Sequence, residues 1–363
     1  MAVQAGWRWW VFAGYNAGMA ERTDDRVEAE DGGGWPAAFA RYSRQMLLEG
    51  VGVEGQRRLA GSRVVLIGCG ALGSALAEML VRAGVGFLRV VDRDFIELHN
   101  LQRQSLFDES DIAANLPKAE AAGRKLRLIN SAVTVESVVA DATGRTVEGL
   151  TAGADLILDG TDNLGTRYLI NDAAVSSGRP WIYGACVAAE GRLMAVFPGR
   201  TPCLRCVFGS APAAGTVETC ETVGILGPVA RVVAGFQAAT AIRILAGGGV
   251  AVETGLVTVD LWGLSMRRLE LGGGPDPACP CCRLRRFEYL DGTLGVEATA
   301  LCGRRAVQVS PSGGPGRLDL EGLARRLAGL AGDVRARAYL VRAKVEGCAV
   351  VVFGDGRAII KGT

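Results

Sequence analysis

The sequence predicts an α/β domain built on a doubly wound, mixed sheet, followed by a small α+β C-terminal unit. Three observations support this. From residue 63 onward, short apolar runs alternate with helical segments, as strands and crossover helices do in a largely parallel sheet. A glycine-rich turn separates the first strand from the first helix. The 363 residues are 49% hydrophobic and 21% charged, which is normal for a protein with a large core.

The predicted elements follow in order along the chain. Arg63–Ile67 and Phe87–Val91 read as strands on either side of the glycine turn and a helix that ends near Ala83. Further elements are a helix over 117–129 with proline at its start, strands over 133–139 and 155–158, a helix over 164–175, and strands over 181–183 and 193–197. The sheet is expected to be parallel in its first half.

Three segments are expected. Residues 1–34, acidic and glycine-rich toward their end, are interpreted as a disordered or non-native stretch, with translation starting at Met19. Residues 35–290 form the main domain. Residues 291–363 form the accessory unit, with a helix over 318–330, a strand over 349–353 and a loop over 310–316.

No membrane or nucleic-acid partner is expected. The net charge is +2, which offers no strong field for an anionic partner. The apolar run near residues 9–13 is too short for a signal peptide. The longer apolar stretch over 223–252 contains Arg231, Gln237 and Arg243, so it is interpreted as a buried helix. The 10 cysteines are partly paired, which favours metal or thiol chemistry in a reducing cytoplasm.

A nucleotide site is predicted at the glycine turn. Gly68, Gly70 and Gly73 form a G-x-G-x-x-G motif between a strand and a helix. Such a turn lets backbone N–H groups approach phosphates. Asp92, at the end of the next strand, is the carboxylate for ribose hydroxyls.

Polar residues after Asp92 favour ATP over NAD. Asn100, Arg103, Gln104 and Lys118 follow it, and Asp162 comes just after another strand. A triphosphate needs such groups for orientation and charge neutralisation, whereas a dehydrogenase needs no such cluster of an amide, two cations and a further acid around the phosphates. Asp162 is the candidate ligand for Mg²⁺.

Two C-x-x-C pairs are candidates for a structural zinc site. They are Cys203 with Cys206, and Cys279 with Cys282, and Cys281 is an extra thiol that could replace a neighbour. Four thiolates can close a tetrahedral Zn²⁺ site. Buried reduced cysteines and a redox C-x-x-C are the alternatives, although the strand–motif–helix setting of the latter is missing. Four further cysteines are interpreted as small core residues: Cys69, Cys186, Cys302 and Cys348.

Over residues 39–286 the chain resembles the ThiF/MoeB/HesA adenylyltransferases, which are related to ubiquitin-activating enzymes. The resemblance rests on the ordered set Arg41-Tyr-Ser-Arg44-Gln45, the glycine turn, Asn100-Leu-Gln-Arg103-Gln104, Pro117-Lys118 and Thr161-Asp162-Asn163. It implies a Rossmann-like fold, ATP, Mg²⁺ and a structural zinc on Cys203, Cys206, Cys279 and Cys282. It also implies ribose binding by Asp92 and phosphate contacts by Asn100, Arg103 and Lys118.

The resemblance further implies the reaction and its partners. ATP would adenylylate the C-terminal glycine of a ubiquitin-like sulfur carrier with a Gly-Gly tail, for thiamin-thiazole or molybdopterin synthesis. Arg44 would reach across a homodimer to the partner's triphosphate. Cys220 would accept a persulfide from a cysteine desulfurase or rhodanese, or link to the carrier. Its position before the long apolar helix predicts a lowered thiol pKa.

Two other functions are weighed. The cyclising dehydratase of threonylcarbamoyl-adenosine in tRNA belongs to the same family, but it commonly lacks the paired C-x-x-C element, and this chain has no basic surplus to hold tRNA. An NAD-dependent oxidoreductase accounts for the glycine turn and Asp92. It gives no role to Arg44, Arg103, Lys118, Asp162 or the paired cysteines.

Overall fold

The structure is a computed structural model that describes residues 37–212, 216–220, 222–247, 255–294, 300–301, 306–309, 318–337, 339–354 and 356–362. The predictions for residues 1–34, for the loop over 310–316 and for Cys302 lie outside these ranges. The chain divides into two units, 1–43 and 44–363. In the first, the described residues include the 3-10 helix η1 (Ala37–Tyr42). All strands of the described residues belong to the second.

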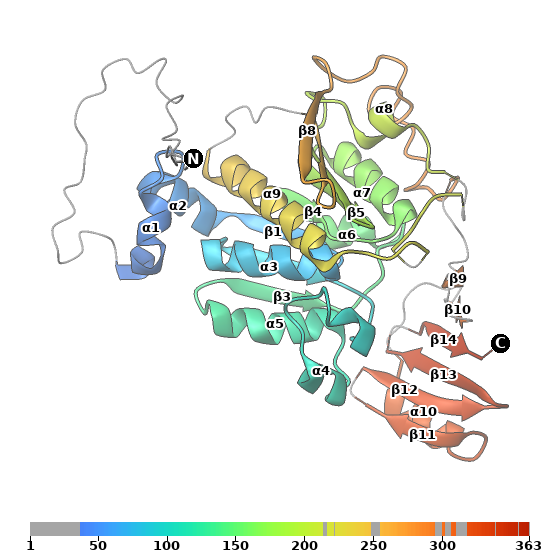
Figure 1. Ribbon diagram of the computed structural model, residues 1–363. Helices are drawn as coiled ribbons and strands as arrows, with labels where there is room; N and C mark the ends of the chain where they lie inside the picture. Colours follow the sequence, from blue (N-terminus) through green and yellow to red (C-terminus); the bar gives the residue numbers. More distant parts are fainter. Residues whose placement is uncertain are drawn as a thin grey trace, which may run out of the picture. The chain divides into compact units, whose positions relative to one another are not determined.

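An eight-stranded mixed sheet forms the centre of the second unit (Figure 1). Its order is β3-β2-β1-β4-β5-β6-β7-β8. The strands are β1 (Arg63–Ile67), β2 (Phe87–Val91), β3 (Thr134–Val138), β4 (Leu156–Asp159), β5 (Trp181–Val187), β6 (Glu190–Val196), β7 (Gly255–Asp260) and β8 (Ser265–Glu270). Pairing is parallel from β3 to β5 and antiparallel from β5 to β8. The predicted doubly wound mixed sheet is confirmed.

Two cores on opposite faces of the sheet make it doubly wound. In β1, Val64 and Leu66 belong to one core, and Val65 and Ile67 to the other, because successive strand side chains point to opposite faces. The first core includes residues of α2 (Gly52–Gly61), α3 (Ala71–Ala83), α5 (Lys118–Ile129) and α9 (Gly227–Ala246). The second includes residues of α6 (Val147–Thr151), α7 (Leu164–Ser177) and α8 (Leu204–Phe208). Short helices are α1 (Ser43–Met46), η2 (Leu98–Asn100) and α4 (Glu109–Ala113).

Helix α9 is the apolar helix expected within residues 223–252. Its length and composition alone would let it cross a membrane, but half of that stretch is buried. It packs on α3, α2, β5 and β6, and the buried amide of Gln237 donates to the carbonyl of Asp159 at 2.9 Å. The structure therefore places it as a core helix, as the sequence predicts.

A second, six-stranded sheet lies near the C-terminus. It has the order β11-β12-β13-β14-β10-β9 and antiparallel pairing. The strands are β9 (Ala300–Leu301), β10 (Ala306–Val309), β11 (Gly332–Ala336), β12 (Leu340–Val345), β13 (Cys348–Phe353) and β14 (Ala358–Lys361). Helix α10 (Leu320–Leu327) precedes β11 and is shorter than the predicted 318–330. The predicted α+β character is confirmed, whereas the segment boundaries at 35 and 291 stay predictions.

Candidate functional site

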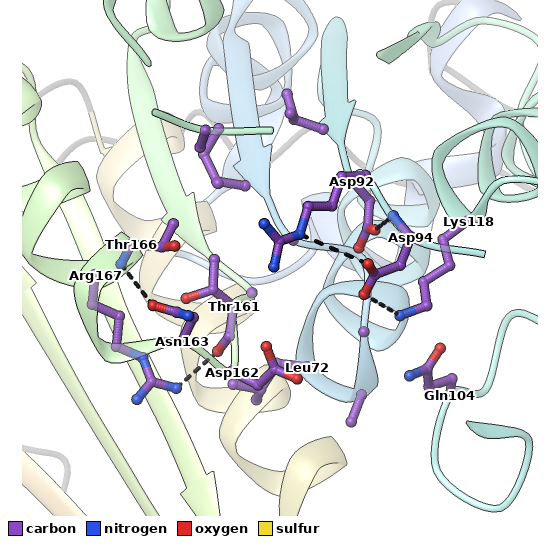
Figure 2. A pocket seen from close by; sticks show the side chains of 18 of the residues that line it. Leu72, Asp92, Asp94, Gln104, Lys118, Thr161, Asp162, Asn163, Thr166 and Arg167 are labelled. Carbon is purple, nitrogen blue, oxygen red and sulfur yellow. Dashed lines mark hydrogen bonds and ion pairs between the residues drawn. The ribbon is translucent and has the colours of Figure 1, made fainter. Parts of the chain in front are cut away.

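A pocket opens where β1, β2 and β4 end. Figure 2 shows its side chains, and it lies where the strand order passes from β1 to β4, the point at which open α/β sheets bind ligands. Its lining includes eight residues singled out from the sequence: Gly68, Gly70, Asp92, Arg103, Gln104, Lys118, Asp162 and Cys220. It also includes Arg93, Asp94, Thr161, Asn163, Thr166, Arg167 and Cys186.

Two glycines of the turn, Gly68 and Gly73, lie so close to other backbone segments that no side chain fits there. Gly68 has φ +90, and a Cβ there would lie 2.7 Å from the carbonyl carbon of Gly160. A Cβ on Gly73 would lie 2.0 Å from the carbonyl oxygen of Gly68. Gly73 therefore lets α3 approach β1, while a Cβ on Gly70 would meet only Gln104 Nε2, at 3.8 Å. Gly70 is the glycine that leaves space for a ligand.

Asp92 braces the loops around the pocket. One carboxylate oxygen accepts the backbone N–H of Cys69 at 2.7 Å, and the other accepts that of Asp94 at 2.7 Å. Each oxygen has a further lone pair, so both can also accept ribose hydroxyls. Burial raises the pKa of Asp92 and Lys118 lowers it, with a net rise above the ordinary value.

Lys118 supplies a buried cation beside these carboxylates. Its side chain is 8% exposed, and Nζ lies 3.1 Å from Asp94 Oδ2, as Figure 2 shows. Burial alone would lower its pKa, but Asp94, Asp92 and Asp162 together raise it above the ordinary value. Lys118 therefore stays charged throughout the physiological pH range and can neutralise a phosphate.

Asp159 and Arg167 form a buried pair that sequence reasoning missed. Nε of Arg167 lies 3.4 Å from Asp159 Oδ2, and Nη2 donates to the carbonyl of Thr161 at 2.8 Å. The other oxygen of Asp159 accepts from the amide and hydroxyl of Thr161. These bonds fix the turn that carries Asp162. The sequence could have indicated this pair. A carboxylate in the apolar run 155–159 needs a cation when it is buried, and Arg167 is the only basic residue in the next helix.

The remaining predicted residues divide between the pocket and its surroundings. Asp162 is exposed within the pocket, and Arg103 bonds the carbonyl of His99 at 2.8 Å. Gln104 is 4% exposed, and its Oε1 has no hydrogen-bond partner among the described residues. Asn100 does not line the pocket, because its Oδ1 accepts the N–H of Glu97 at 3.0 Å in a capping box. Arg44 is exposed and also lies outside the lining.

Cys220 lines the pocket, but its predicted pKa shift is wrong. Burial, followed by the negative charge of Asp162, raises the pKa of Cys220. The expected helix N-terminus is too far away, because α9 begins only at Gly227. Cys220 Sγ lies 3.3 Å from the carbonyl of Cys186. Of the cysteines interpreted as core residues, Cys69 is fully buried, Cys186 instead lines the pocket, and Cys348 is partly exposed on β13.

Four cysteines form a separate cluster. The Sγ atoms of Cys203, Cys206, Cys279 and Cys282 all lie within 4.8 Å of one another. The separations are 3.6 Å for Cys203 and Cys279, 3.8 Å for Cys203 and Cys206, and 3.4 Å for Cys206 and Cys282. A tetrahedral zinc with Zn–S bonds of about 2.3 Å places its sulfurs roughly 3.8 Å apart. The geometry of the cluster therefore fits Zn²⁺, with Cys281 outside the four.

Comparison with known proteins agrees with this arrangement. Residues 42–281 match the ThiF family. The chain belongs to the ThiF family. This ThiF-family protein is 43% identical to the sulfur carrier protein ThiS adenylyltransferase of Bacillus subtilis, over 89% of this chain and 95% of that one. It is 40% identical to the SAMP-activating enzyme E1 of Haloferax volcanii, over 72% and 95% of the two chains.

Two further similarities cover less of the other protein or have lower sequence identity. The adenylyltransferase and sulfurtransferase MOCS3 of Sus scrofa is 39% identical, but the match covers 72% of this chain and only 58% of MOCS3. Among solved structures, E. coli MccB with ATP superposes with a TM-score of 0.58 at 24% identity, over 68% of this chain and 76% of that one. At that identity MccB shows that the fold is shared, and no more.

Proposed function

We propose that this ThiF-family protein uses ATP to adenylylate the C-terminal glycine of a ubiquitin-like sulfur carrier, and that the carrier is of the ThiS type. One observation carries the reaction: Asp92, Arg103, Lys118 and Asp162 line one pocket around the glycine turn. The choice of carrier rests on the similarity to the Bacillus subtilis ThiS adenylyltransferase. That match spans 323 residues and so includes part of the C-terminal sheet, whereas the Haloferax match spans 261.

The chemistry needs positioning and charge neutralisation rather than a base. A carrier carboxylate is ionised at neutral pH. One of its oxygens forms a bond to the α-phosphorus of ATP, the bond from that phosphorus to the β-phosphate bridging oxygen breaks, and pyrophosphate leaves. Lys118 and Arg103 stabilise the negative charge of the triphosphate. Asp92 and Gln104 orient the nucleoside, and Gln104 offers its unpartnered oxygen as an acceptor.

Metal ions have two proposed places. Asp162 is the exposed pocket carboxylate suited to the Mg²⁺ of the nucleotide. Cys203, Cys206, Cys279 and Cys282 would hold a structural Zn²⁺, since their spacing matches a closed four-thiolate site. The zinc would stabilise the fold by joining the segment of Cys203 and Cys206 to that of Cys279 and Cys282, and none of these four residues lines the pocket.

The partners are proposed from the family pattern. Arg44 would act on the triphosphate of the other subunit in a homodimer, which agrees with its exposure and its place outside the pocket of its own chain. Cys220 lies in the pocket, so it would meet the activated carrier terminus and receive sulfur from a cysteine desulfurase or rhodanese-type donor. Its raised pKa means that a neighbouring base or the donor itself must activate the thiol.

Carrier-dependent exchange of radiolabelled pyrophosphate into ATP tests the reaction. Purified ThiS-type and MoaD-type carriers are each added to the wild-type protein and to Asp162→Ala. We expect exchange with the ThiS-type carrier, weaker exchange with the MoaD type, and none with the variant. Exchange with the MoaD type alone would reject the proposed carrier. No exchange with either, together with tight binding of NAD or a tRNA, would reject the reaction.

A further inference from the structure

Helix α7 joins the nucleotide pocket to the four-cysteine cluster. Its N-cap residue Asn163 and its first-turn residues Thr166 and Arg167 line the pocket. One turn after Arg167, Asn171 and Asp172 are fully buried. There α7 packs against α8, which starts directly after Cys203 (Figure 1). One helix therefore contacts both sites, with its first turn in the pocket and its middle beside the cysteine cluster.

The side chain of Asn171 bridges the two halves of the cysteine cluster. Its Oδ1 accepts the backbone N–H of Leu204 at 2.9 Å, inside the first C-x-x-C pair. Its Nδ2 donates to Sγ of Cys281 at 3.3 Å, inside the second. The two pairs are separated by 76 residues of sequence. Asn171 thus supplies no metal ligand, yet it contacts both segments that do.

Neighbouring residues attach the second cysteine segment to the same helix. Asp172 accepts the backbone N–H of Tyr289 at 2.9 Å. The guanidinium of Arg285 donates to the carbonyls of Val175 and Ser176, at 3.4 Å each. These bonds hold the chain just after Cys282 along the length of α7.

We propose that Asn171 is a positioning residue that sets the two cysteine pairs for zinc binding, and that α7 couples zinc retention to nucleotide binding. Groups that orient metal ligands typically change metal affinity 10–100-fold when they are lost. The coupling would run through the start of the same helix, where Asn163 caps the helix by accepting the N–H of Thr166 and Arg167 donates to the carbonyl of Thr161, next to Asp162. This role rests on the zinc assignment made above.

Zinc release tests the positioning role. Asn171→Asp keeps the acceptor for Leu204 but removes the donor to Cys281 and adds a charge that repels thiolates. Asn171→Ala removes both bonds. The matched control is Asn130→Ala, because Asn130 is 1% exposed, belongs to the part of the fold around α5, and donates to the carbonyl of Val81 at 2.8 Å. Zinc content is measured after purification, and transfer to a chromogenic chelator is then timed.

We expect stoichiometric zinc in the wild type, and release about 10-fold faster or more from Asn171→Asp and Asn171→Ala than from the control. Equal release from Asn171→Asp and Asn130→Ala would overturn the positioning role. A wild-type protein purified without zinc would instead overturn the zinc assignment, and the role with it. If Asn171→Ala does not fold, the comparison of Asn171→Asp with the control decides.

Calorimetric binding of a non-hydrolysable ATP analogue tests the coupling, first in the wild type and then in the variants. We expect the dissociation constant of the wild type to rise several-fold when zinc is stripped and to recover when zinc is returned. Asn171→Asp should bind the analogue more weakly than Asn130→Ala does. Identical binding by loaded and stripped wild-type protein would overturn the coupling.

Discussion

At the scale of single residues, Lys118 is the cation on which the charge balance of the pocket depends. It is 6% exposed, and it lies close to Asp92, which is 9% exposed. Lys118→Met leaves that carboxylate buried without its cation, a loss that costs roughly 3 kcal/mol of stability as well as ATP binding. We expect lower unfolding midpoints in urea and no detectable pyrophosphate exchange.

The pH dependence of that loss has a definite sign. Burial already raises the pKa of Asp92, and removal of Lys118 raises it further. A carboxyl whose pKa is raised by folding destabilises the folded state as pH rises, and the effect vanishes below its unfolded pKa. The variant should therefore lose more stability at pH 8 than at pH 5. An equal loss of stability at pH 5 and pH 8 would contradict this explanation. So would a double variant, Lys118→Met with Asp92→Asn, that is no more stable at pH 8 than Lys118→Met alone. Arg57→Met is the control, since its partner Glu54 is 67% exposed.

Cys220 should be a slow nucleophile until something activates it. Its pKa is raised first by burial and then by Asp162, while Arg103 and Arg167 lower it. Asp162→Asn removes a charge that disfavours the thiolate, so alkylation of Cys220 at pH 8 should become several-fold faster, since the rate follows the thiolate fraction. Iodoacetamide labelling followed by peptide mass spectrometry measures this, with Cys348 as the reference thiol. Slower labelling in the variant would show that Asp162 does not control this cysteine.

At the scale of elements, two glycines of one turn have separable roles. Gly73→Ala places a Cβ against the backbone oxygen of Gly68 and forces α3 away from β1. We expect a loss of several kcal/mol in stability, as in other overpacked cores. Gly70→Ala meets no backbone atom, so the protein should fold normally but bind ATP at least 10-fold more weakly, because the methyl group occupies ligand space. Urea denaturation and calorimetric ATP titration distinguish the two. Normal ATP affinity in Gly70→Ala would mean that the phosphates lie elsewhere.

The elements that the sequence predicts well are those whose signal is local. The strand–turn–helix unit around Gly68 and the strand ending before Asp92 carry their own periodicity and turn residues. Strands β5 and β6 extend beyond the predicted 181–183 and 193–197, because their remaining residues are stabilised by pairing with each other, from Trp181 opposite Val196 to Val187 opposite Glu190. Such pairing leaves little trace in either segment alone.

In the candidate site, too, residues with a local sequence signal were predicted and those that depend on the folded structure were missed. Asp92, Lys118 and Asp162 were predicted because each belongs to a motif, and they line one pocket. The Asp159 and Arg167 pair was missed because its meaning depends on burial, and the thiol pKa of Cys220 was wrong because Asp162 lies near it only in the folded chain. The role of Asn171 could not be predicted for the same reason, since its two hydrogen-bond partners are 33 and 110 residues away in the sequence.

At the scale of the whole molecule, the pocket of one chain lacks the cation that the family pattern assigns to Arg44. Closed symmetric dimers allow each subunit to complete the site of the other. Arg44→Ala and Asp162→Ala should therefore each be inactive alone. When the two are coexpressed at equal levels, half of the dimers are mixed and one of their two sites is intact, which predicts about a quarter of wild-type exchange activity.

The control for this complementation places both defects in the same pocket. Lys118→Met and Asp162→Ala each damage the pocket of their own chain, so every site in their mixed dimer carries one defect and no activity should return. Sequential purification on two different affinity tags verifies that mixed dimers form, and pyrophosphate exchange is then measured on the unseparated mixture of dimers. If Arg44 acts within its own chain, the first pair will fail as the second does, because each mixed site will again contain one defect.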